Sequence, residues 1–433
     1  MRSVTRAQGN LFEGQRLQMT DSIAMTIASL QAYGPRFQHW VTAYSGGKDS
    51  TALVTLIIYL ILARKTSAPK TLTVVYADTR MEIPALWLAA ARIREELEDK
   101  AEMLAALGCM LTVRVVMAPL DDRFLVYMLG RGVPPPNNRF RWCTPRLKVQ
   151  PMLRAVEELR ASVGEKLLML TGVRVGESAA RDERIVTSCT RDGAECGQGW
   201  FQETVPDAIA DTLAPLLHWR VCHVWEWLKH WAPSFEFGDW TTEPLADAYG
   251  GDEAEEINAR TGCIGCNLVE TDKGLEASIR NGWAYTAPLR KLKALWGELI
   301  APAMRLRKPG GERTKAGKLA AKQQRLGPLT FEARRMGLAR VLAIQAEVNE
   351  EADRLARPQI DILNAEEVAR IEELIEARTW PDGWNGTEPT GDAWLDKVLK
   401  GGAVQPLLLS PEALSRGSGT HVLEHALIAA LDE

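Results

Sequence analysis

Between residues 41 and 53 the chain reads Val41-Thr42-Ala43-Tyr44-Ser45-Gly46-Gly47-Lys48-Asp49-Ser50-Thr51-Ala52-Leu53. An apolar, β-favouring run precedes the two glycines and an apolar segment of helical length follows them, which predicts a strand, a tight turn and a helix. Consecutive glycines let the backbone approach an anion closely, and the helix directs its positive end at the same point. Lys48 adds a full positive charge, and Ser45 and Ser50 add hydroxyl donors. The segment from Ser45 to Ser50, the glycine loop, is therefore suited to hold a pyrophosphate group.

The composition is that of a globular protein of two or three domains. The chain has 433 residues, of which 46% are apolar and 25% are charged. No signal-peptide pattern is present and the most apolar run, 52–63, is too short to cross a bilayer, so we expect no membrane contact and a cytoplasmic location. Seven cysteines in such a chain predict metal or redox roles for some of them rather than a disulfide framework.

Apolar, β-rich runs alternate with helical periods through the first half of the chain. We expect strands at 40–44, 71–76, 111–117 and 166–171, and helices at 21–33, 50–63, 84–107 and 147–163. This alternation predicts an α/β fold with a doubly wound, mainly parallel sheet. Ser45, Asp78 and Gly172 then fall at the carboxyl ends of strands, where such sheets bind ligands.

Beyond residue 283 only helical periods continue, at 285–300, 330–349 and 364–378, the last opened by a capping box of Asn364 and Glu367. We expect four parts: an N-terminal helical segment (1–37), a nucleotide-binding domain that holds the cysteines (38–285), a basic helical extension (286–380) and an irregular C-terminal tail (381–433). The whole chain has a net charge of −4, yet residues 305–340 contain eleven Lys and Arg and two Glu, a net charge of +9. This basic stretch (Arg305–Arg340) is expected to face an anion.

Further candidate site residues follow the second and fourth expected strands. Asp78 offers a carboxylate for a ribose hydroxyl, the adenine amine or Mg²⁺, and a helix cap is its structural alternative. Gly172 lets the backbone approach a nucleotide, Arg174 and Arg181 can neutralise phosphate oxygens, and Glu177 can orient either arginine. A surface ion-pair cluster would use the same residue types.

A basic run surrounds Trp142-Cys143-Thr144 and is expected to lie in a loop after the third strand. Its position at the same sheet edge suits a second anion, the substrate, although a solvated basic loop would have the same composition. Its charged members are Arg139, Arg141, Arg146 and Lys148.

The segment Cys263-Ile264-Gly265-Cys266 is the clearest metal signal, because a C-x-x-C turn directs two thiolates to one centre and Gly265 permits the bend. Two further ligands are needed, and we expect Cys143 and Cys196, with Cys189 as the alternative to Cys196. No histidine lies near the pair, so all-thiolate ligation of a [4Fe–4S] cluster or of Zn is favoured over a thioredoxin-type redox pair. Two other cysteines are expected in the core: Cys109 and Cys222.

In this order the glycine loop, Asp78-Thr79, Trp142–Pro151 and Gly172–Arg181 resemble the motifs of the PAPS reductase family of adenine nucleotide α-hydrolase-like proteins. In that family the S-G-G-K-D-S segment is the PP-loop of ATP pyrophosphatases. Two more blocks resemble the family's last helix and its cysteine-pair segment: Leu216–Trp227 and Arg260–Cys266. Within the family the chain looks closest to the DndC-type iron–sulfur sulfurtransferase of DNA phosphorothioation, with a similar extension at Gly327–Arg335. Cluster-holding APS reductases carry adjacent cysteines where Trp142-Cys143 stands here. Assimilatory reductases use a nucleophilic cysteine near the C-terminus, whereas no cysteine follows Cys266.

The resemblance implies a HUP/PP-loop type of sheet, a glycine loop that binds ATP with Mg²⁺, and a [4Fe–4S] cluster. Catalytic roles are expected for Lys48, Asp49 and Arg174 at the departing pyrophosphate. The implied activity is that of an ATP pyrophosphatase and sulfurtransferase. It would adenylylate an acceptor oxygen, such as a DNA phosphate, and replace it with sulfur from a cysteine desulfurase. The basic stretch would then follow the DNA backbone. Two alternatives stay open: an APS/PAPS-type reductase that releases sulfite, and a non-catalytic nucleotide-binding subunit of a defence complex.

Overall fold

The chain divides into two units in the computed structural model, which describes residues 17–176, 209–251, 262–309 and 325–393. It also describes 311, 313–314 and 316–318, and the backbone of 194–195 and 200–202. Unit 1 comprises Met1–Phe124, Asn138–Arg290 and Glu347–Ile360. Unit 2 comprises Leu125–Asn137, Lys291–Ala346 and Asp361–Glu433.

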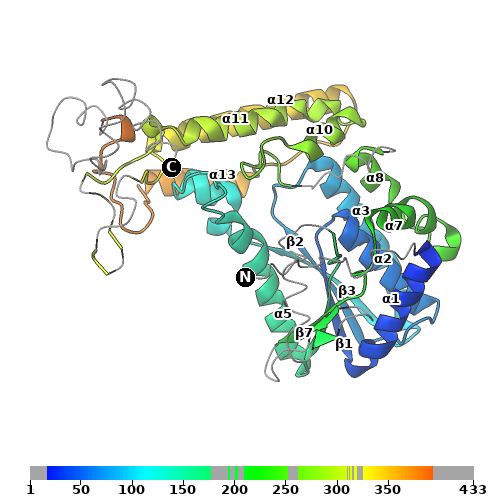
Figure 1. The fold of residues 1–433 in the computed structure, drawn as a ribbon. Helices are drawn as coiled ribbons and strands as arrows, with labels where there is room; N and C mark the ends of the chain where they lie inside the picture. The colour runs from blue at the N-terminus through cyan, green and yellow to red at the C-terminus, as the bar shows by residue number, and fades with distance from the viewer. Residues whose placement is uncertain are drawn as a thin grey trace, which may run out of the picture. The chain divides into compact units, whose positions relative to one another are not determined.

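Unit 1 contains a seven-stranded sheet with the order β3-β2-β1-β4-β7-β6-β5 (Figure 1). The first five strands of that order are parallel, with Trp40 of β1 opposite both Leu72 and Leu168, and β6 and β5 are added antiparallel. The predicted α/β class with a mainly parallel sheet is therefore confirmed. The strands are β1 His39–Tyr44, β2 Thr71–Asp78, β3 Met110–Met117, β4 Leu167–Leu170, β5 Ala194–Glu195, β6 Trp200–Gln202 and β7 Ala210–Ala214.

Strand β7 was not predicted from the sequence, and Asp211 explains why. A charged residue at the second position of a five-residue strand hides the apolar pattern of a buried strand. In the structure Asp211 is buried and its Oδ1 lies 2.7 Å from Nζ of Lys166. The ion pair offsets the cost of burying the carboxylate and so allows the residue to stand inside the sheet.

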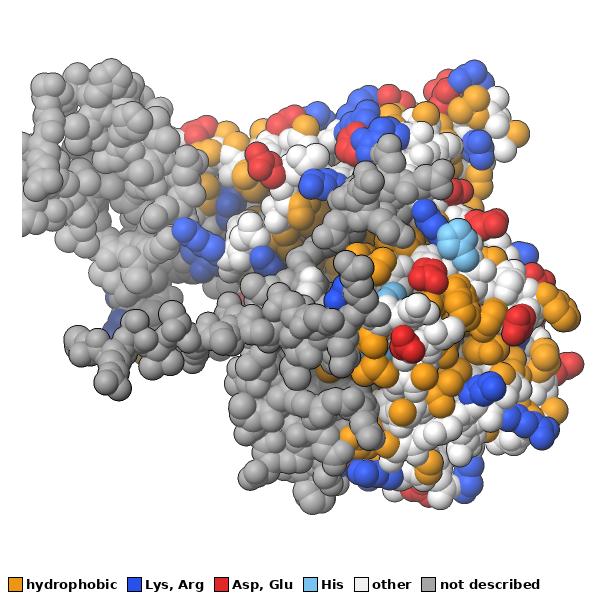
Figure 2. Space-filling model, turned by 45° about the vertical axis from the view of Figure 1, so that its right-hand side comes forward, with side chains coloured by type: hydrophobic (Ala, Val, Ile, Leu, Met, Phe, Trp, Pro, Cys, Tyr) orange, Lys and Arg blue, Asp and Glu red, His pale blue; other side chains and the backbone are white. Residues whose placement is uncertain are grey.

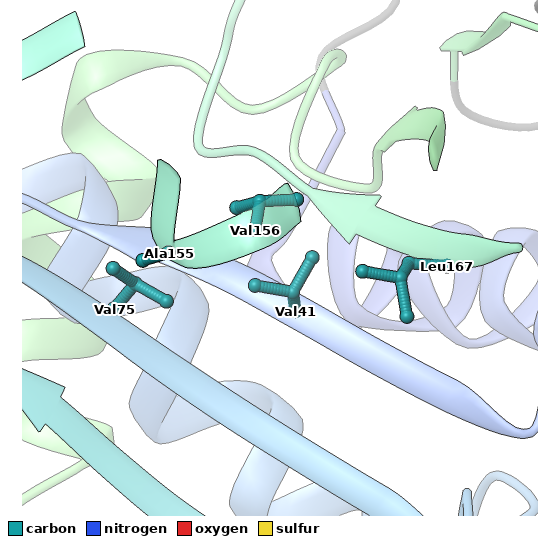
Figure 3. Packing of buried hydrophobic residues seen from close by; sticks show 5 residues of the cluster. All are labelled: Val41, Val75, Ala155, Val156 and Leu167. Carbon is teal, nitrogen blue, oxygen red and sulfur yellow. The ribbon is translucent and has the colours of Figure 1, made fainter. Parts of the chain in front are cut away.

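Helices cover both faces of this sheet, as the alternation of side chains along β1 demonstrates. Val41 points to a cluster with Ala155 and Val156 of α5, shown with Val75 and Leu167 in Figure 3. Tyr44 lies three residues further, on the opposite face, where its hydroxyl is 3.5 Å from Oγ1 of Thr51 on α2. The helices of unit 1 include α1 Met19–Tyr33, α2 Lys48–Leu62, α3 Pro84–Asp99, α4 Ala101–Ala105, α5 Gln150–Val163, α7 Val221–Glu226, α8 Glu243–Tyr249 and α10 Lys273–Arg280.

Two predicted helices of unit 1 differ in detail from the observed ones. The long helix expected at 84–107 ends at Asp99, and the separate turn α4 follows Lys100, whose ammonium lies 4.4 Å from the ring centroid of Trp240. The helix expected from residue 147 begins with a π-helical turn, Pro145–Val149, before α5 starts at Gln150.

The remaining helices confirm the helical character predicted for the C-terminal part. They are α11 Arg290–Leu299, α12 Phe331–Arg354 and α13 Ala365–Glu376. The capping box is present: Oδ1 of Asn364 accepts from Glu367 N at 2.8 Å, and Asn364 N donates to Oε2 of Glu367 at 3.2 Å. No helix in the described part of the chain has both the length and the apolar composition that a bilayer span requires.

Candidate active site

The glycine loop connects β1 to α2 with the predicted geometry. The chain leaves β1 at Tyr44, reverses at Gly46 with φ of +71°, and enters α2 through Gly47, the N-cap residue. A side chain at Gly46 would place its Cβ 2.7 Å from Cβ of Ala90, so both the positive φ and the close approach require glycine here. The N-terminus of the 15-residue helix α2 therefore opens directly onto the loop.

Hydrogen bonds between the two serines close the loop. The backbone N of Ser45 donates to Oγ of Ser50 at 3.2 Å, and Oγ of Ser50 donates to the carbonyl of Gly47 at 3.0 Å. The two hydroxyl oxygens are 3.1 Å apart. Both serines, which we predicted as phosphate donors, thus also hold the loop in shape before any ligand is bound.

The three predicted catalytic residues form one chain of charges. Nζ of Lys48 lies 3.1 Å from Oδ2 of Asp49, and Nε of Arg174 donates to Oδ1 of the same carboxylate at 2.6 Å. Arg174 is buried, and its Nη1 donates to the carbonyl of Trp219 at 3.3 Å. Asp49 therefore ties the start of α2 to the segment after β4, and Arg174 acts on the loop through Asp49.

Gly172 brings β4 against the glycine loop. A Cβ at this position would lie 3.0 Å from the carbonyl oxygen of Asp49 and 3.3 Å from the amide nitrogen of Ser50. Strand order reverses between β1 and β4, since β2 lies on one side of β1 and β4 on the other. The glycine loop and Gly172 thus meet at a topological switch point, where open α/β sheets bind their ligands.

The loop after β2 presents two carboxylates rather than the one we predicted. Oδ1 of Asp78 accepts from the backbone N of Arg80 at 2.8 Å. Oγ1 of Thr79 donates to Oε1 of Glu82 at 2.6 Å, whereas Oε2 of Glu82 is buried and has no hydrogen-bond partner within the described residues. Burial raises the pKa of Glu82, against the opposing effects of Thr79 and Lys148. Sequence reasoning missed Glu82 because it considered only the residue that ends the strand.

The segment with the cysteine pair lies against the loop after β2. Cys263 forms a β-bridge with Glu82, and the backbone N of Ile264 donates to the carbonyl of Met81 at 2.7 Å. Gly265 has a φ of +65°, and the backbone N of Cys266 donates to the carbonyl of Cys263 at 3.2 Å. The tight turn predicted for the pair is confirmed.

A small cavity, of about 30 Å³, lies between the glycine loop and Cys263 of the cysteine pair. The loop forms one part of its wall, and Cys263, Lys148 and Glu82 form another. Residues separated by more than 200 positions in the sequence therefore line a single polar space. Its lining is completed by Tyr76, Ile83, Leu86 and Gly262, with Ser45, Gly46 and Gly47 from the loop.

The ammonium of Lys148 interacts electrostatically with Glu82 and with the thiols of this site. Burial alone would lower the pKa of Lys148, but Cys263, Glu82, Cys143 and Cys266 together outweigh that effect and the pKa is raised. Burial raises the pKa of Cys263 to about 12, an effect that Lys148 opposes. Burial also raises the pKa of Cys143, and Cys266 adds to this increase. The three thiols therefore lie close enough to the Lys148 ammonium to raise its pKa.

The predicted metal ligands are only partly within the described residues. Cys143, Cys263 and Cys266 are half-buried, but no three His, Cys, Asp or Glu side chains in the described part of the chain stand in a metal-binding arrangement. Four predicted site residues lie outside the described residues: Glu177, Arg181, Cys189 and Cys196. Of the cysteines expected in the core, Cys109 is buried as predicted, whereas Cys222 is exposed, because it lies on the outer side of α7.

The basic run around Cys143 is largely engaged by neighbours. Arg141 donates to Oδ1 of Asn138 at 2.8 Å, and Arg146 pairs with Asp122 at 2.5 Å. Lys148 is the member of the run that lines the cavity. The run therefore contributes one cation to the site, and its arginines form the surrounding loop.

The basic stretch contains arginines that are part of the core of unit 2. Arg334 is fully buried: its guanidinium donates to the carbonyls of Leu329, Gly130 and Thr379 and lies 4.4 Å from the ring centroid of Trp380. Arg307 is buried too, and Arg305 donates to the carbonyls of Gly327 and Leu326. These three cations are not available to a nucleic acid backbone. Among the described residues of the stretch, four cations are exposed: Arg313, Lys318, Arg325 and Arg335.

A second residue that sequence reasoning missed is Tyr249, at the end of α8. Its hydroxyl accepts a hydrogen bond from the backbone N of Lys48 at 3.3 Å. The two residues are 201 positions apart, so no local pattern indicates the contact.

Comparison with known proteins gives one family match. Residues 39–232 match the model of the phosphoadenosine phosphosulfate reductase domain. None of the curated proteins compared with the chain matches it. Among solved structures, FMN adenylyltransferase of Candida glabrata in complex with FMN and the ATP analogue AMPCPP is similar at 18% identity and a TM-score of 0.28. That similarity covers 49% of this chain and 57% of the adenylyltransferase, little more than half of its length. The match over residues 39–232, which include β1, the glycine loop and Gly172, supports the PAPS reductase and adenine nucleotide α-hydrolase-like family for this part of the chain.

Proposed function

We propose that the protein is an ATP pyrophosphatase that activates an acceptor oxygen by adenylylation and then exchanges that oxygen for sulfur. The acceptor oxygen attacks the α-phosphorus of ATP and forms a new P–O bond, while the bond to the β-phosphate breaks and pyrophosphate leaves. A sulfur nucleophile from a donor protein then bonds to the activated centre, and AMP leaves with the acceptor oxygen. When that nucleophile is a persulfide, a thiol then attacks the donor's sulfur in the new S–S bond, so that the thiol and the donor form a disulfide and the acceptor keeps a thiolate. The thiol is the reductant of the step.

The observation that carries this proposal is the shared cavity of the glycine loop and Cys263. A phosphate cradle alone would suit many nucleotide-binding proteins. A thiol and a buried lysine in the wall of the same cavity suit a reaction in which sulfur chemistry follows nucleotide activation. The family match to a reductase domain that acts on a sulfur-bearing nucleotide is consistent with this combination.

Lys48 and Asp49 of the glycine loop have roles in holding the leaving group. The N-terminus of α2 and the ammonium of Lys48 stabilise the charge that develops on pyrophosphate. Asp49, fixed by Arg174 at 2.6 Å, holds that ammonium 3.1 Å away. Mg²⁺, which prefers carboxylate and phosphate oxygens, would be held by the triphosphate with Asp78.

Thiolates are the ligands that a [4Fe–4S] cluster or Zn prefers, although the described side chains do not stand in a metal-binding arrangement. Cys143, Cys263 and Cys266 are three soft donors, and these would hold a [4Fe–4S] cluster or Zn together with Cys196 or Cys189. When bound, such a centre would supply sulfur chemistry to the site. Anaerobic purification tests the assignment: a brown protein that absorbs near about 400 nm contains the cluster, and a colourless zinc protein does not.

A DNA phosphate as acceptor and a cysteine desulfurase as sulfur donor are the more specific form of the proposal. The support for DNA is the set of exposed cations in the basic stretch. The Lys and Arg side chains visible in Figure 2 are interspersed with Asp and Glu rather than gathered in one continuous field. Because Arg307 and Arg334 are buried, contact of the described basic stretch with DNA would depend on its exposed cations.

The experiment that tests the function uses ATP labelled at the α-phosphorus. We expect pyrophosphate release and a labelled AMP adduct that depend on the acceptor, and we expect Lys48→Ala to abolish both. Two other functions give different results. A reductase, favoured by the name of the matching domain, would release sulfite from adenylyl sulfate. A non-catalytic nucleotide-binding subunit would bind ATP and release no pyrophosphate.

A further inference from the structure

Tyr249 touches the glycine loop in two ways. Its hydroxyl oxygen accepts from the backbone N of Lys48 at 3.3 Å, and its ring centroid lies 5.6 Å from the Lys48 ammonium. The ring is buried and packs edge-on against Trp225 of α7, with centroids 5.1 Å apart. Because Trp225 is itself fully buried, the position of the tyrosine is fixed by packing.

The amide that Tyr249 engages is the first of α2, since the helix begins at Lys48. Amides in the first turn of a helix have no partner within the helix and are the donors that bind phosphate oxygens. Two other amides of the loop are engaged by serine hydroxyls: Ser45 N by Oγ of Ser50 at 3.2 Å and Gly47 N by Oγ of Ser45 at 3.4 Å. The phenol oxygen therefore stands at the place where an oxygen of pyrophosphate would be received.

We infer that the Tyr249 hydroxyl is a further pyrophosphate-binding group of the glycine loop and that its ring positions the Lys48 ammonium. A tyrosine hydroxyl both accepts and donates hydrogen bonds. When a phosphate oxygen takes the amide of Lys48, the phenol O–H turns and donates to the same anion. No covalent bond changes in this exchange. The inference rests on the proposed function, because it assumes that the loop binds the diphosphate half of ATP.

The ring supplies a second effect. An ammonium over an aromatic face is attracted to the ring electrons, and the attraction grows where water is excluded. Lys48 is thus held between the Asp49 carboxylate at 3.1 Å and the Tyr249 ring. Removing the hydroxyl alone should affect binding of the anion, whereas removing the ring should also release the lysine side chain.

The test is calorimetric binding of inorganic pyrophosphate and of AMP to the full chain and its variants. Tyr249→Phe removes only the hydroxyl, and we expect the pyrophosphate dissociation constant to rise about tenfold, as for one lost hydrogen bond to a charged group. AMP has no β-phosphate, so its affinity should not change. Tyr249→Leu removes the ring as well and should weaken pyrophosphate binding further. Tyr285→Phe is the matched control, because it deletes another hydroxyl of unit 1, one that donates to the carbonyl of Pro358 at 3.0 Å.

The outcomes separate this inference from the proposed function. If the wild type binds pyrophosphate, Lys48→Ala does not, and Tyr249→Phe equals the wild type, the inference is wrong and the function stands. If Tyr249→Phe weakens AMP and pyrophosphate binding alike, the hydroxyl has only a structural role and the inference is again wrong. If the wild type binds no pyrophosphate, both proposals fail together.

Discussion

At the scale of single residues, Gly46 shows how little freedom the loop has. Its φ is +71°, and an added Cβ would meet Cβ of Ala90 at 2.7 Å. Gly164, with φ of +73°, has a comparable backbone but no heavy atom within 4 Å of such a Cβ. We expect Gly164→Ala to cost about 1 kcal/mol of stability, the strain of a left-handed alanine alone. Gly46→Ala should in addition displace the loop and abolish most pyrophosphate release. Thermal unfolding and a pyrophosphate assay on both variants check this, and equal behaviour of the two would contradict it.

The buried charge of Arg174 makes a second prediction at this scale. Its guanidinium has little contact with solvent and depends on Asp49 at 2.6 Å and on the carbonyl of Trp219. Arg174→Met leaves Asp49 without its fixed partner, and loss of one member of a buried pair costs about 3 kcal/mol. Arg290→Met breaks the exposed pair with Glu276 and should cost less than about 1 kcal/mol. Urea unfolding measures both changes in unfolding free energy, and an unchanged m-value shows that the change is one of stability. If the two variants lose similar amounts of unfolding free energy, the Arg174–Asp49 pair stabilises the fold no more than an exposed pair does.

At the scale of elements, α1 is held to the segment after β7 through histidine. Nε2 of His218 lies 2.9 Å from the carbonyl oxygen of Ser22, and burial lowers the pKa of His218 below its ordinary value near 6.5. Below pH about 6.5 the unfolded chain therefore binds a proton that the folded chain resists, so stability falls as the pH falls through this window. We expect His218→Gln to flatten the dependence of melting temperature on pH between 7 and 5. An unchanged slope for His218→Gln would refute the prediction.

Elements whose signal is local were predictable from the sequence, and those that depend on a distant partner were not. The glycine loop was recognised because strand, turn and helix follow one another without interruption between Trp40 and Ile61, and the capping box at Asn364 because both partners lie within one turn. Strand β7 was not predicted because the charge of Asp211 is compensated by an ion pair with Lys166, which the local sequence does not indicate. Tyr249 and the second carboxylate, Glu82, became visible only when the fold brought them to the loop.

At the scale of the whole molecule, net charge was the least informative part of the sequence. Eleven cations between residues 305 and 340 predicted a surface that faces an anion. Arg334 instead lies against the backbone of Gly132, where an added Cβ would meet its Nη2 at 2.0 Å, and it stabilises unit 2 from within. A count of charges does not distinguish an arginine that binds carbonyl groups from one that is available to a phosphate. Only the burial of its side chain distinguishes the two kinds of arginine, and that burial depends on the fold.

The remaining exposed cations are the ones through which the basic stretch would bind a DNA acceptor. Arg313 and Lys318 are exposed in the basic stretch, and each phosphate contact contributes close to one unit to the slope of log affinity against log salt. If the stretch binds a DNA backbone, the double variant Arg313→Ser, Lys318→Ser should lower that slope by up to about two, without a change in base preference. The same change at Lys70 and Arg154, exposed cations of unit 1, should leave the slope as it is. Fluorescence anisotropy with a labelled duplex over a range of salt concentrations measures these slopes. Binding that is absent, or that does not respond to salt, would remove DNA as the acceptor while the glycine loop and its pyrophosphate chemistry would stand.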